Sequence, residues 1–388
     1  MRRHLSSAGP LLIEATCNQV NQFGGYTGMK PADFRELVHG IAAQAGFPTD
    51  RILLGGDHLG PYPWQNLSAD QAMANAGEMV RLFVQEGYGK LHLDASMPCA
   101  DDPRPLPDAV IAERAAKLCS AAEAARGSGE PVYVIGTEVP TPGGAVDETG
   151  ISVTAAEAAE EALCLHREAF SACGLDRAWE RVIALVVQPG VEFAHETVED
   201  YARARAAQLS ALLDRHPGLV FEAHSTDYQR PEALSALVED GFAILKVGPA
   251  LTYAMRQALS ALATIEDECV SAANRSHLCE RVEQVMLAHP EHWQKHYVGS
   301  PEQQRRLRIH SYSDRIRYYW AYPEVKQAIE ALIRNLENSG IPETMLSDYL
   351  PAQYKKVRGG TLRNQPLPLI LDAIGNALDP YLAACAGK

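Results

Sequence analysis

The sequence predicts an α/β fold of the TIM (β/α)8-barrel type with a C-terminal helical extension. Short apolar runs alternate with helix-like stretches up to Gly248, and strand–helix units of roughly 30 to 45 residues imply parallel strands joined by crossover helices. The chain also lacks a G-x-G-x-x-G turn between a strand and a helix, so a barrel is favoured over an open nucleotide-binding sheet. After Gly248 the alternation stops.

Seven short apolar runs, each ending in polar residues, are the expected strands. Their continuous apolar character is typical of a parallel sheet whose outer face is covered by helices. The runs are 11–17, 51–58, 90–96, 132–138, 182–189, 219–225 and 242–248.

The stretches between these runs are rich in Ala, Leu and Glu, which are strong helix formers. The expected helices are 31–46, 69–87, 107–127, 155–174, 198–213 and 231–241, followed in the extension by 251–268, 278–289, 323–338 and 368–385. We therefore divide the chain into a (β/α) barrel that carries the site, residues 1–252, and a helical extension packed on it, residues 253–388.

Composition narrows the function. The 388 residues include 35 Lys and Arg against 49 Asp and Glu, a formal charge of −14. This balance argues against a nucleic-acid or membrane-surface binder, although local backbone donors can still bind a small anionic substrate. Eight scattered cysteines without a C-x-x-C pair fit a reducing compartment. With no secretory signal or 18-residue apolar run, we expect a cytoplasmic protein.

Polar residues gather at the predicted carboxyl ends of the strands, where parallel barrels carry their active sites. They are Glu14, Thr16, Asn18, Asp57, His58, His92, Asp94, Ser96, Thr137, Glu138, Gln188, Glu222, His224, Ser225 and Lys246. Each unpaired buried charge costs several kcal/mol, so these groups are expected to be paired, metal-bound or catalytic. For any one of them alone, a hydrogen-bonded polar layer at the barrel mouth is an equal alternative.

Two interpretations concern particular residues of this set. His58 and His224 with Glu138 form a possible two-histidine, one-carboxylate site for a divalent metal, and Asp57 beside His58 is placed for proton transfer. Lys246 either forms a Schiff base with a ketose or pairs with a strand-end carboxylate. The ion pair is favoured, because a neighbouring carboxylate raises the pKa of a lysine.

Two weaker signals lie in the extension. His289, His292 and His296 have helical spacing and suit a metal, but the charged residues between them favour a solvated helix face. Arg315 and Arg317 either hold a phosphate or pair with acidic surface residues. No phosphate-binding loop and no protein-kinase motif set is present, so ATP-dependent phosphoryl transfer has no support.

Long motifs of this chain resemble one known family. They are EATCNQVNQFGGYTGM, GGDHLGP, HLDASM, GTEVPTPGG, VVQPGVEF, FEAHSTDYQ, LKVGPALT and SDRIRYYW, which together cover nearly the whole chain. The chain is identified by them as a member of the Z-subunit family of class II D-tagatose-1,6-bisphosphate aldolase (GatZ/KbaZ type). This family was long labelled as a tagatose 6-phosphate kinase, and it is similar to the class II aldolases, which are zinc-dependent TIM barrels.

The resemblance implies roles for several residues. Asp57 and His58 match the aldolase pair of a proton-transferring Asp and a zinc-ligating His, and His224 matches a second ligand. The strand that carries the third aldolase histidine offers Gln188 here, so Glu138 is taken as the substitute ligand. Zn2+ is the expected metal. The residues expected to bind substrate are Asn18, His92, Gln188, Ser225, Lys246, Gly248 and Arg315, with the amides around Ser225 and Gly248 placed for a phosphate.

The resemblance also carries two functions. Some members act alone as D-tagatose 6-phosphate 4-epimerases, and others are non-catalytic partners that stabilise the catalytic aldolase subunit. We expect the epimerase, because a pure scaffold has no need for ionisable strand ends, and we expect an oligomer. The family has one further strand–helix unit before EATCNQ, so either the N-terminus is shortened or the barrel is incomplete. The shortened N-terminus is favoured, and an N-terminally extended chain should be more soluble and stable.

The expected mechanism is a retro-aldol cleavage followed by re-addition. A carboxylate removes the proton from O4 of the ketose phosphate, and the candidates are Asp57, Glu14 and Asp94. The C3–C4 bond breaks, the divalent metal stabilises the enediolate, and the aldehyde re-adds through its other face. This sequence of steps inverts C4.

Overall fold

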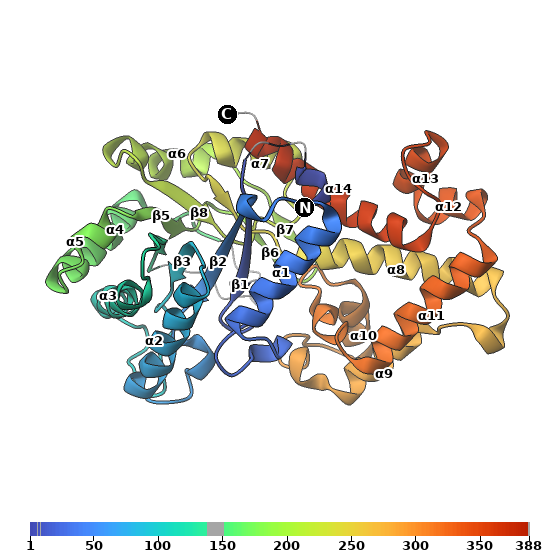
Figure 1. The fold of residues 1–388 in the computed structure, drawn as a ribbon, viewed down its shortest axis with the longest axis horizontal. Coiled ribbons are helices and arrows are strands. Elements are labelled where there is room, and N and C mark those ends of the chain that lie inside the picture. The colour runs from blue at the N-terminus through green and yellow to red at the C-terminus, as the bar shows by residue number, and fades with distance from the viewer. Residues whose placement is uncertain (6, 8, 138–150, 387–388) are drawn as a thin grey trace.

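The computed structural model describes residues 1–386 except 6, 8 and 138–150 (Figure 1). Its main sheet has seven strands in the order β1-β2-β3-β4-β5-β8-β9, and every neighbouring pair is parallel. The strands are β1 (Leu11–Thr16), β2 (Ile52–Leu59), β3 (Lys90–Leu93), β4 (Val132–Ile135), β5 (Val182–Val187), β8 (Val220–Ala223) and β9 (Ile244–Leu245). All seven predicted strands are confirmed.

Helices connect these strands and cover the outer face of the sheet (Figure 1). They are α1 (Pro31–Ala45), α2 (Ala69–Gln85), α3 (Asp108–Ala125), α4 (Ala156–Ala172), α5 (Asp176–Trp179), α6 (Arg203–Ala211) and α7 (Pro231–Glu239). The predicted helix 198–213 begins later, at Arg203. The reason is a small antiparallel hairpin, β6 (Glu192–Phe193) with β7 (Val198–Glu199), which takes up the first residues.

Strand β3 alternates between hydrophobic and charged or polar positions, whereas Val134, Ala184 and Val186 on the inner face of β4 and β5 are apolar. In β3, Leu91 and Leu93 are fully buried in the main core, and Lys90 and His92 occupy the alternate positions. Successive side chains of a strand point to opposite faces, so this pattern directs the lysine and the histidine to the inside of the curled sheet. The polar groups of the site are therefore placed by the period-two pattern of the strands.

The sheet has two edges among the described residues, β1 and β9. Side chains bridge these edges, since Lys246, directly after β9, donates from Nζ to Glu14 Oε2 of β1 at 2.5 Å. The predicted parallel α/β architecture is confirmed as a curled seven-stranded sheet. No strand pairing closes it into a barrel within the part of the chain that the structure describes.

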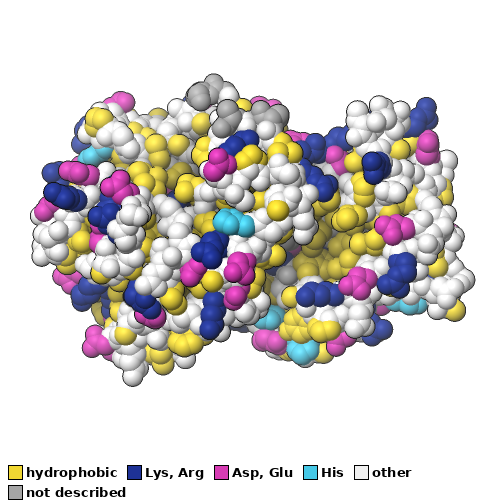
Figure 2. Space-filling model, in the orientation of Figure 1, with side chains coloured by type: hydrophobic (Ala, Val, Ile, Leu, Met, Phe, Trp, Pro, Cys, Tyr) yellow, Lys and Arg dark blue, Asp and Glu magenta, His cyan; other side chains and the backbone are white. Residues whose placement is uncertain are grey.

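The C-terminal extension is helical, as predicted. Its helices are α8 (Pro249–Cys269), α9 (Leu278–Ala288), α10 (Pro301–His310), α11 (Pro323–Ser339), α12 (Glu343–Tyr349), α13 (Pro351–Arg358) and α14 (Pro366–Ala386). They share a second hydrophobic core that includes Leu262, Met286 and Leu332. On the face seen in Figure 2, hydrophobic side chains gather in the recess between this extension and the sheet.

Helix α14 joins the two parts of the molecule. It packs against α7 and α8, and Tyr381 and Ala384 at its end belong to the core of the sheet. Arg3 near the N-terminus pairs with Asp372 of this helix at 2.7 Å. By length and composition alone α14 could span a membrane, although no apolar run of that length stood out in the sequence. The expected boundary at 252/253 falls inside α8.

Candidate metal centre

The centre begins with an irregularity in β2. The pairing register of β2 with β3 shifts between Gly56 and Leu59, and His58 between them has a left-handed backbone with φ of 50°. Neighbouring residues of a regular strand point to opposite faces, whereas a bulge re-aims one of them. As a result, Asp57 and His58 both reach the inner side of the sheet. A left-handed histidine is uncommon and typical of a functional position.

Glycines around this pair make room for close approaches. A Cβ built on Gly60 would lie 1.5 Å from the backbone oxygen of Asp94, and one on Gly55 would lie 2.5 Å from Oε1 of Glu14. Both distances are far below van der Waals contact. The GGDHLG run therefore reflects how tightly β2 packs against the site residues on the two neighbouring strands.

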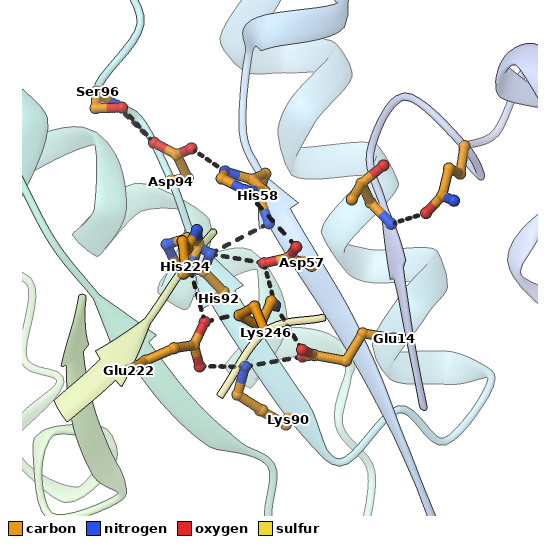
Figure 3. A network of polar contacts seen from close by, with 12 residues as sticks. Glu14, Asp57, His58, Lys90, His92, Asp94, Ser96, Glu222, His224 and Lys246 are labelled. Carbon is orange, nitrogen blue, oxygen red and sulfur yellow. Dashed lines mark hydrogen bonds and ion pairs between the residues drawn. The ribbon is translucent and has the colours of Figure 1, made fainter. Parts of the chain in front are cut away.

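Four potential metal ligands meet at this point. Asp57 and His58 from β2, His92 from β3 and His224 just after β8 point toward one another (Figure 3). One ligand atom from each lies within 4.8 Å of all the others, and all four residues are buried. The three histidine ring centroids are 4.9 to 5.3 Å apart.

Each histidine of the group is hydrogen-bonded to a different carboxylate. The pairs are His58 Nδ1 with Asp94 Oδ2 at 2.7 Å, His92 Nδ1 with Asp57 Oδ1 at 3.0 Å, and His224 Nε2 with Glu222 Oε1 at 2.9 Å. An ionised carboxylate only accepts, so the bonded nitrogen carries the ring proton. We assign the lone pairs accordingly to His58 Nε2 and His224 Nδ1. His92 Nδ1 also lies 3.3 Å from the His58 backbone nitrogen, which donates to it, so these contacts alone do not fix the tautomer of His92.

This arrangement fits a metal ion. Metal-binding histidines usually donate their other ring nitrogen to a carboxylate, which orients the ring and fixes its tautomer. His92 Nε2 is buried and has no hydrogen-bond partner among the described residues. An unsatisfied buried polar atom is costly, and with the ring proton on Nδ1 a bound cation would satisfy this nitrogen. Three imidazoles with a nearby carboxylate form a donor set that suits Zn2+.

The pKa shifts are consistent with this assignment. Burial alone would raise the pKa of Asp57, but His58 and Lys246 outweigh it and hold the pKa well below its ordinary value. Burial lowers the pKa of His224 to about 4, so its ring is neutral at pH 7, the form that binds metals. Burial also disfavours protonation of His58, yet Asp57 and Asp94 raise its pKa above the ordinary value. A metal would therefore displace a proton there.

The inner charges do not cancel. Glu14, Asp57, Asp94 and Glu222 are four carboxylates, whereas the lysines that pair with them are Lys90 and Lys246. Lys90 Nζ lies 2.8 Å from Glu14 Oε1 and 2.5 Å from Glu222 Oε2. With neutral histidines the set carries two excess negative charges, which a divalent cation would neutralise.

Lys246 is an ion-pair residue in this structure. Its Nζ lies 2.5 Å from Glu14 Oε2 and 2.6 Å from Asp57 Oδ1. Burial would lower the pKa of Lys246, but the two carboxylates and Glu222 outweigh burial and raise it. A Schiff base needs a neutral amine, so the geometry favours the ion-pair interpretation over the covalent one.

The three predicted proton-transfer carboxylates differ in what they contact. Asp94 uses Oδ1 for the Ser96 hydroxyl at 2.6 Å and Oδ2 for His58, so it is placed to orient that ring. Both oxygens of Glu14 are paired with lysines. Asp57 has one open oxygen, because Oδ2 lies 3.7 Å from His58 Nε2 and has no hydrogen bond within the described ranges. It is the carboxylate best placed to accept a proton.

Several predicted substrate-binding residues have other partners. Gln188 Oε1 accepts from the backbone of Gly190 and Val191 at 2.8 and 2.9 Å, so this side chain is folded onto its own loop. The Gly248 N–H donates to Asp227 Oδ1 at 3.0 Å and is already engaged.

The other predicted positions add the following. Ser225 follows His224 in a left-handed backbone conformation, with φ of 54°. Asn18 accepts through its backbone oxygen from the Tyr26 N–H at 2.9 Å. Glu138, the expected third metal ligand, lies outside the described residues.

The motif residues of the extension are not among the four potential ligands. Arg315 and Arg317 belong to the 3-10 helix η8 (Arg315–Tyr319). Helix α9 ends at Ala288, so His289, His292 and His296 do not share one helix face. His292 stacks on Tyr318, with ring centroids 5.2 Å apart.

The structure groups His92 with the potential metal ligands, whereas the sequence indicated a substrate-binding role for it. The signal was present in the HLD run, since His92 and Asp94 are two residues apart and therefore share the inner face. The resemblance to class II aldolases instead indicated that the third histidine ligand should lie on the strand that carries Gln188.

The protein is therefore an α/β protein with a candidate metal centre. One aspartate and three histidines are buried together at the carboxyl edge of its curled parallel sheet. The family model described as D-tagatose-1,6-bisphosphate aldolase subunit GatZ/KbaZ-like matches residues 1–386. The chain belongs to this family.

Three solved structures are similar to this chain to very different degrees. A probable tagatose 6 phosphate kinase from Sinorhizobium meliloti is 51% identical, with a TM-score of 0.92, covering 99% of this chain and 96% of that one. A fructuronate-tagaturonate epimerase from Cohnella laeviribosi is 12% identical, with a TM-score of 0.49 and coverage of 98% and 78%. A fructose-bisphosphate aldolase from Campylobacter jejuni is 13% identical, with a TM-score of 0.40 and coverage of 90% and 85%. At these values, neither of the last two similarities assigns a function.

Proposed function

We propose that this chain is a cytoplasmic, metal-dependent enzyme of D-tagatose 6-phosphate catabolism, and that it is a D-tagatose 6-phosphate 4-epimerase. The observation that carries the proposal is the buried group of Asp57, His58, His92 and His224 with its excess negative charge. A scaffold would gain nothing from burying such a group, because unpaired buried charge is destabilising. The proposal treats the curled sheet as a barrel of the class II aldolase kind.

His58, His92 and His224 would hold the metal, with Asp57 beside them, and Zn2+ is the ion that this donor set suits best. When bound, it would supply positive charge that stabilises oxyanions formed during carbon–carbon bond cleavage. Asp94 would keep the His58 ring oriented and Glu222 the His224 ring. Asp57 would orient the third ring, that of His92.

The chain's own residues would move the proton. Asp57 Oδ2 would accept the proton of the C4 hydroxyl while the electron pair of the C3–C4 bond moves to C3, next to the C2 carbonyl. Lys246 holds the other Asp57 oxygen at 2.6 Å and keeps this carboxylate oriented. After the aldehyde turns over and re-adds, Asp57 would return the proton to O4, which leaves C4 inverted.

A second candidate is a non-catalytic subunit that stabilises a class II tagatose-bisphosphate aldolase. The description of the matching family as an aldolase subunit favours it. The partner would be the catalytic aldolase subunit, and the chain would act within an oligomer.

The deciding experiment uses the purified protein alone with D-tagatose 6-phosphate, with and without EDTA. Fructose 6-phosphate is measured by a coupled assay, and Asp57→Asn serves as the catalytic control. EDTA-sensitive product that disappears in the variant supports the epimerase. An absence of product, together with co-purification and stabilisation of a class II aldolase chain, would replace it with the subunit role.

A further inference from the structure

We propose that Arg315 and Arg317 form a binding site for a phosphate dianion, supplied by the C-terminal extension. The inference deepens the proposed function, and it rests on that function only in taking the phosphate to be that of a ketose substrate. It assigns recognition of the phosphate to the extension and the chemistry to the sheet.

Arg315 is a buried cation that contacts no carboxylate of the described residues. The residue is 8% exposed, and it makes no ion pair within 4.0 Å in the described part of the chain. Its Nε donates to the backbone oxygen of His292, whereas its two Nη atoms have no hydrogen-bond partner among the described residues. The guanidinium is thus fixed at one nitrogen and has two donors left for a ligand.

Arg317 is held beside it by the same aromatic ring. Its guanidinium carbon lies 4.5 Å from the centroid of Tyr318 and that of Arg315 lies 5.2 Å from it. Arg317 Nη2 donates to the Tyr318 hydroxyl at 2.9 Å, and Nη1 donates to the backbone oxygen of Ser313. Two like charges near one ring repel each other, so an anion that contacts both would be stabilising.

The nearby acidic groups are already engaged. Asp314 pairs with Arg256 at 2.8 Å and accepts from the Thr252 hydroxyl at 2.7 Å. Asp227 accepts from the N–H groups of Gly248 and Ala250 at the start of α8. Both carboxylates act on Arg317 over a longer range, but neither is in contact with it.

Two tyrosines connect this pair of arginines to the sheet. Tyr26, in the loop after β1, meets Tyr318 edge-on with ring centroids 5.2 Å apart. Burial raises the pKa of Tyr62, which lies in the 3-10 helix η4 (Tyr62–Trp64) after β2, and both Arg315 and Asp94, the residue that holds His58, also act on that pKa. The arginines therefore lie on the metal-centre side of the extension.

Phosphate is favoured over a carboxylate by charge and geometry. A phosphate monoester carries close to two negative charges at pH 7, and two guanidiniums match it. Arginine binds phosphate through parallel N–H donors, and such charge-assisted bonds are stronger than neutral ones. A uronate carboxylate would need only one of the two arginines.

The test is calorimetric titration of the EDTA-treated full-length chain with D-fructose 6-phosphate, D-fructose and D-fructuronate. The variants are Arg317→Gln and the conservative Arg315→Lys, and the control is Arg305→Gln, an exposed arginine on α10. We expect each site variant to weaken fructose 6-phosphate binding roughly 10- to 100-fold. Binding of D-fructose should be unchanged, and the control should behave as wild type.

Equal weakening for all three sugars would mean a structural defect and would overturn the proposal, as would unchanged phosphate binding in both variants. Tighter wild-type binding of D-fructuronate, lost in the same variants, would replace phosphate by a carboxylate. The epimerase assay separates the two proposals. If the chain is inactive but binds phosphate through the two arginines, the phosphate site is supported and the epimerase function is rejected. If the chain is active and neither variant changes its KM, the epimerase function is supported and the phosphate site is rejected.

Discussion

The carboxyl edge of the sheet, which carries the candidate metal centre, and the arginine pair of the extension differ in how their buried charges are paired. At the carboxyl edge, every histidine ring and both lysines have carboxylate partners, and the set is left with excess negative charge. In the extension, Arg315 and Arg317 have aromatic and backbone partners and no contacting carboxylate among the described residues. The first region is suited to a cation and the second to an anion, as the proposed metal-dependent reaction of a sugar phosphate requires.

The largest effect that we expect is that of Asp57→Asn, which tests the chemistry assigned to the first of these two regions. Losing the open carboxylate oxygen should lower turnover of D-tagatose 6-phosphate about 10²- to 10⁴-fold, while metal remains bound through the three histidines. The measurement is kcat together with metal content. Asp50→Asn, at an exposed position, is the matched control. A fully active Asp57→Asn protein would remove Asp57 from the mechanism.

A second variant pair tests how independent the two regions are. Leu91 lies in the core of the sheet and Leu332 in the core of the extension, and both are fully buried. Each Leu→Ala change should lower the free energy of unfolding by about 2–5 kcal/mol. Because α14 packs on both parts, we expect one cooperative transition in thermal and chemical unfolding. Two separate transitions would show that the regions fold independently.

A third prediction separates the stability of the fold from the chemistry of the site. His166 of α4 is fully buried, and burial lowers its pKa to about 4 from an ordinary value of 6.5. Between these two pH values His166 is protonated in the unfolded chain and neutral in the folded chain, so the free energy of unfolding falls as the pH drops. The loss should approach about 3 kcal/mol by pH 4, with no further contribution from this group below it.

The measurement for His166 is urea unfolding at several pH values, with His166→Leu as the comparison. The variant should have a flatter profile between pH 6.5 and pH 4. An identical slope in both proteins would mean that His166 titrates normally and that other groups set the acid sensitivity.

The smallest effect concerns the carboxylates behind the histidines. Asp94→Asn removes the charged acceptor that orients His58, and partners of this kind change metal affinity about 10- to 100-fold. The measurement is a competition titration with a zinc chelator. Asp94→Asn should remain folded and bind metal more weakly, and an unchanged affinity would contradict the assignment of His58 as a ligand.

Much of the fold followed from the sequence, because burial on two faces makes parallel strands continuous and apolar. All seven strands were predicted, along with helices α1 to α4, α6 to α9, α11 and α14. Helices α10, α12 and α13 were not predicted. Their short, polar sequences are stabilised by the core around Leu332 rather than by their own periodicity.

The site was only partly predictable. Asp57, His58 and His224 come from motifs that end strands, and the structure brings them together. The role of His92 depends on which strands become neighbours, and the bulge at His58 depends on packing against Asp94. The engagement of Gly248 by Asp227 is likewise a tertiary contact between residues 21 positions apart.

The central claim is that three carboxylate-oriented histidines form a metal centre. Its most direct test is the zinc content of the reconstituted and dialysed protein, measured by mass spectrometry for wild type, His92→Ala and the surface variant His216→Ala. We predict about one equivalent of Zn2+ per chain in wild type and in His216→Ala, and almost none in folded His92→Ala. Equal zinc in all three proteins, or none in wild type, would contradict the account.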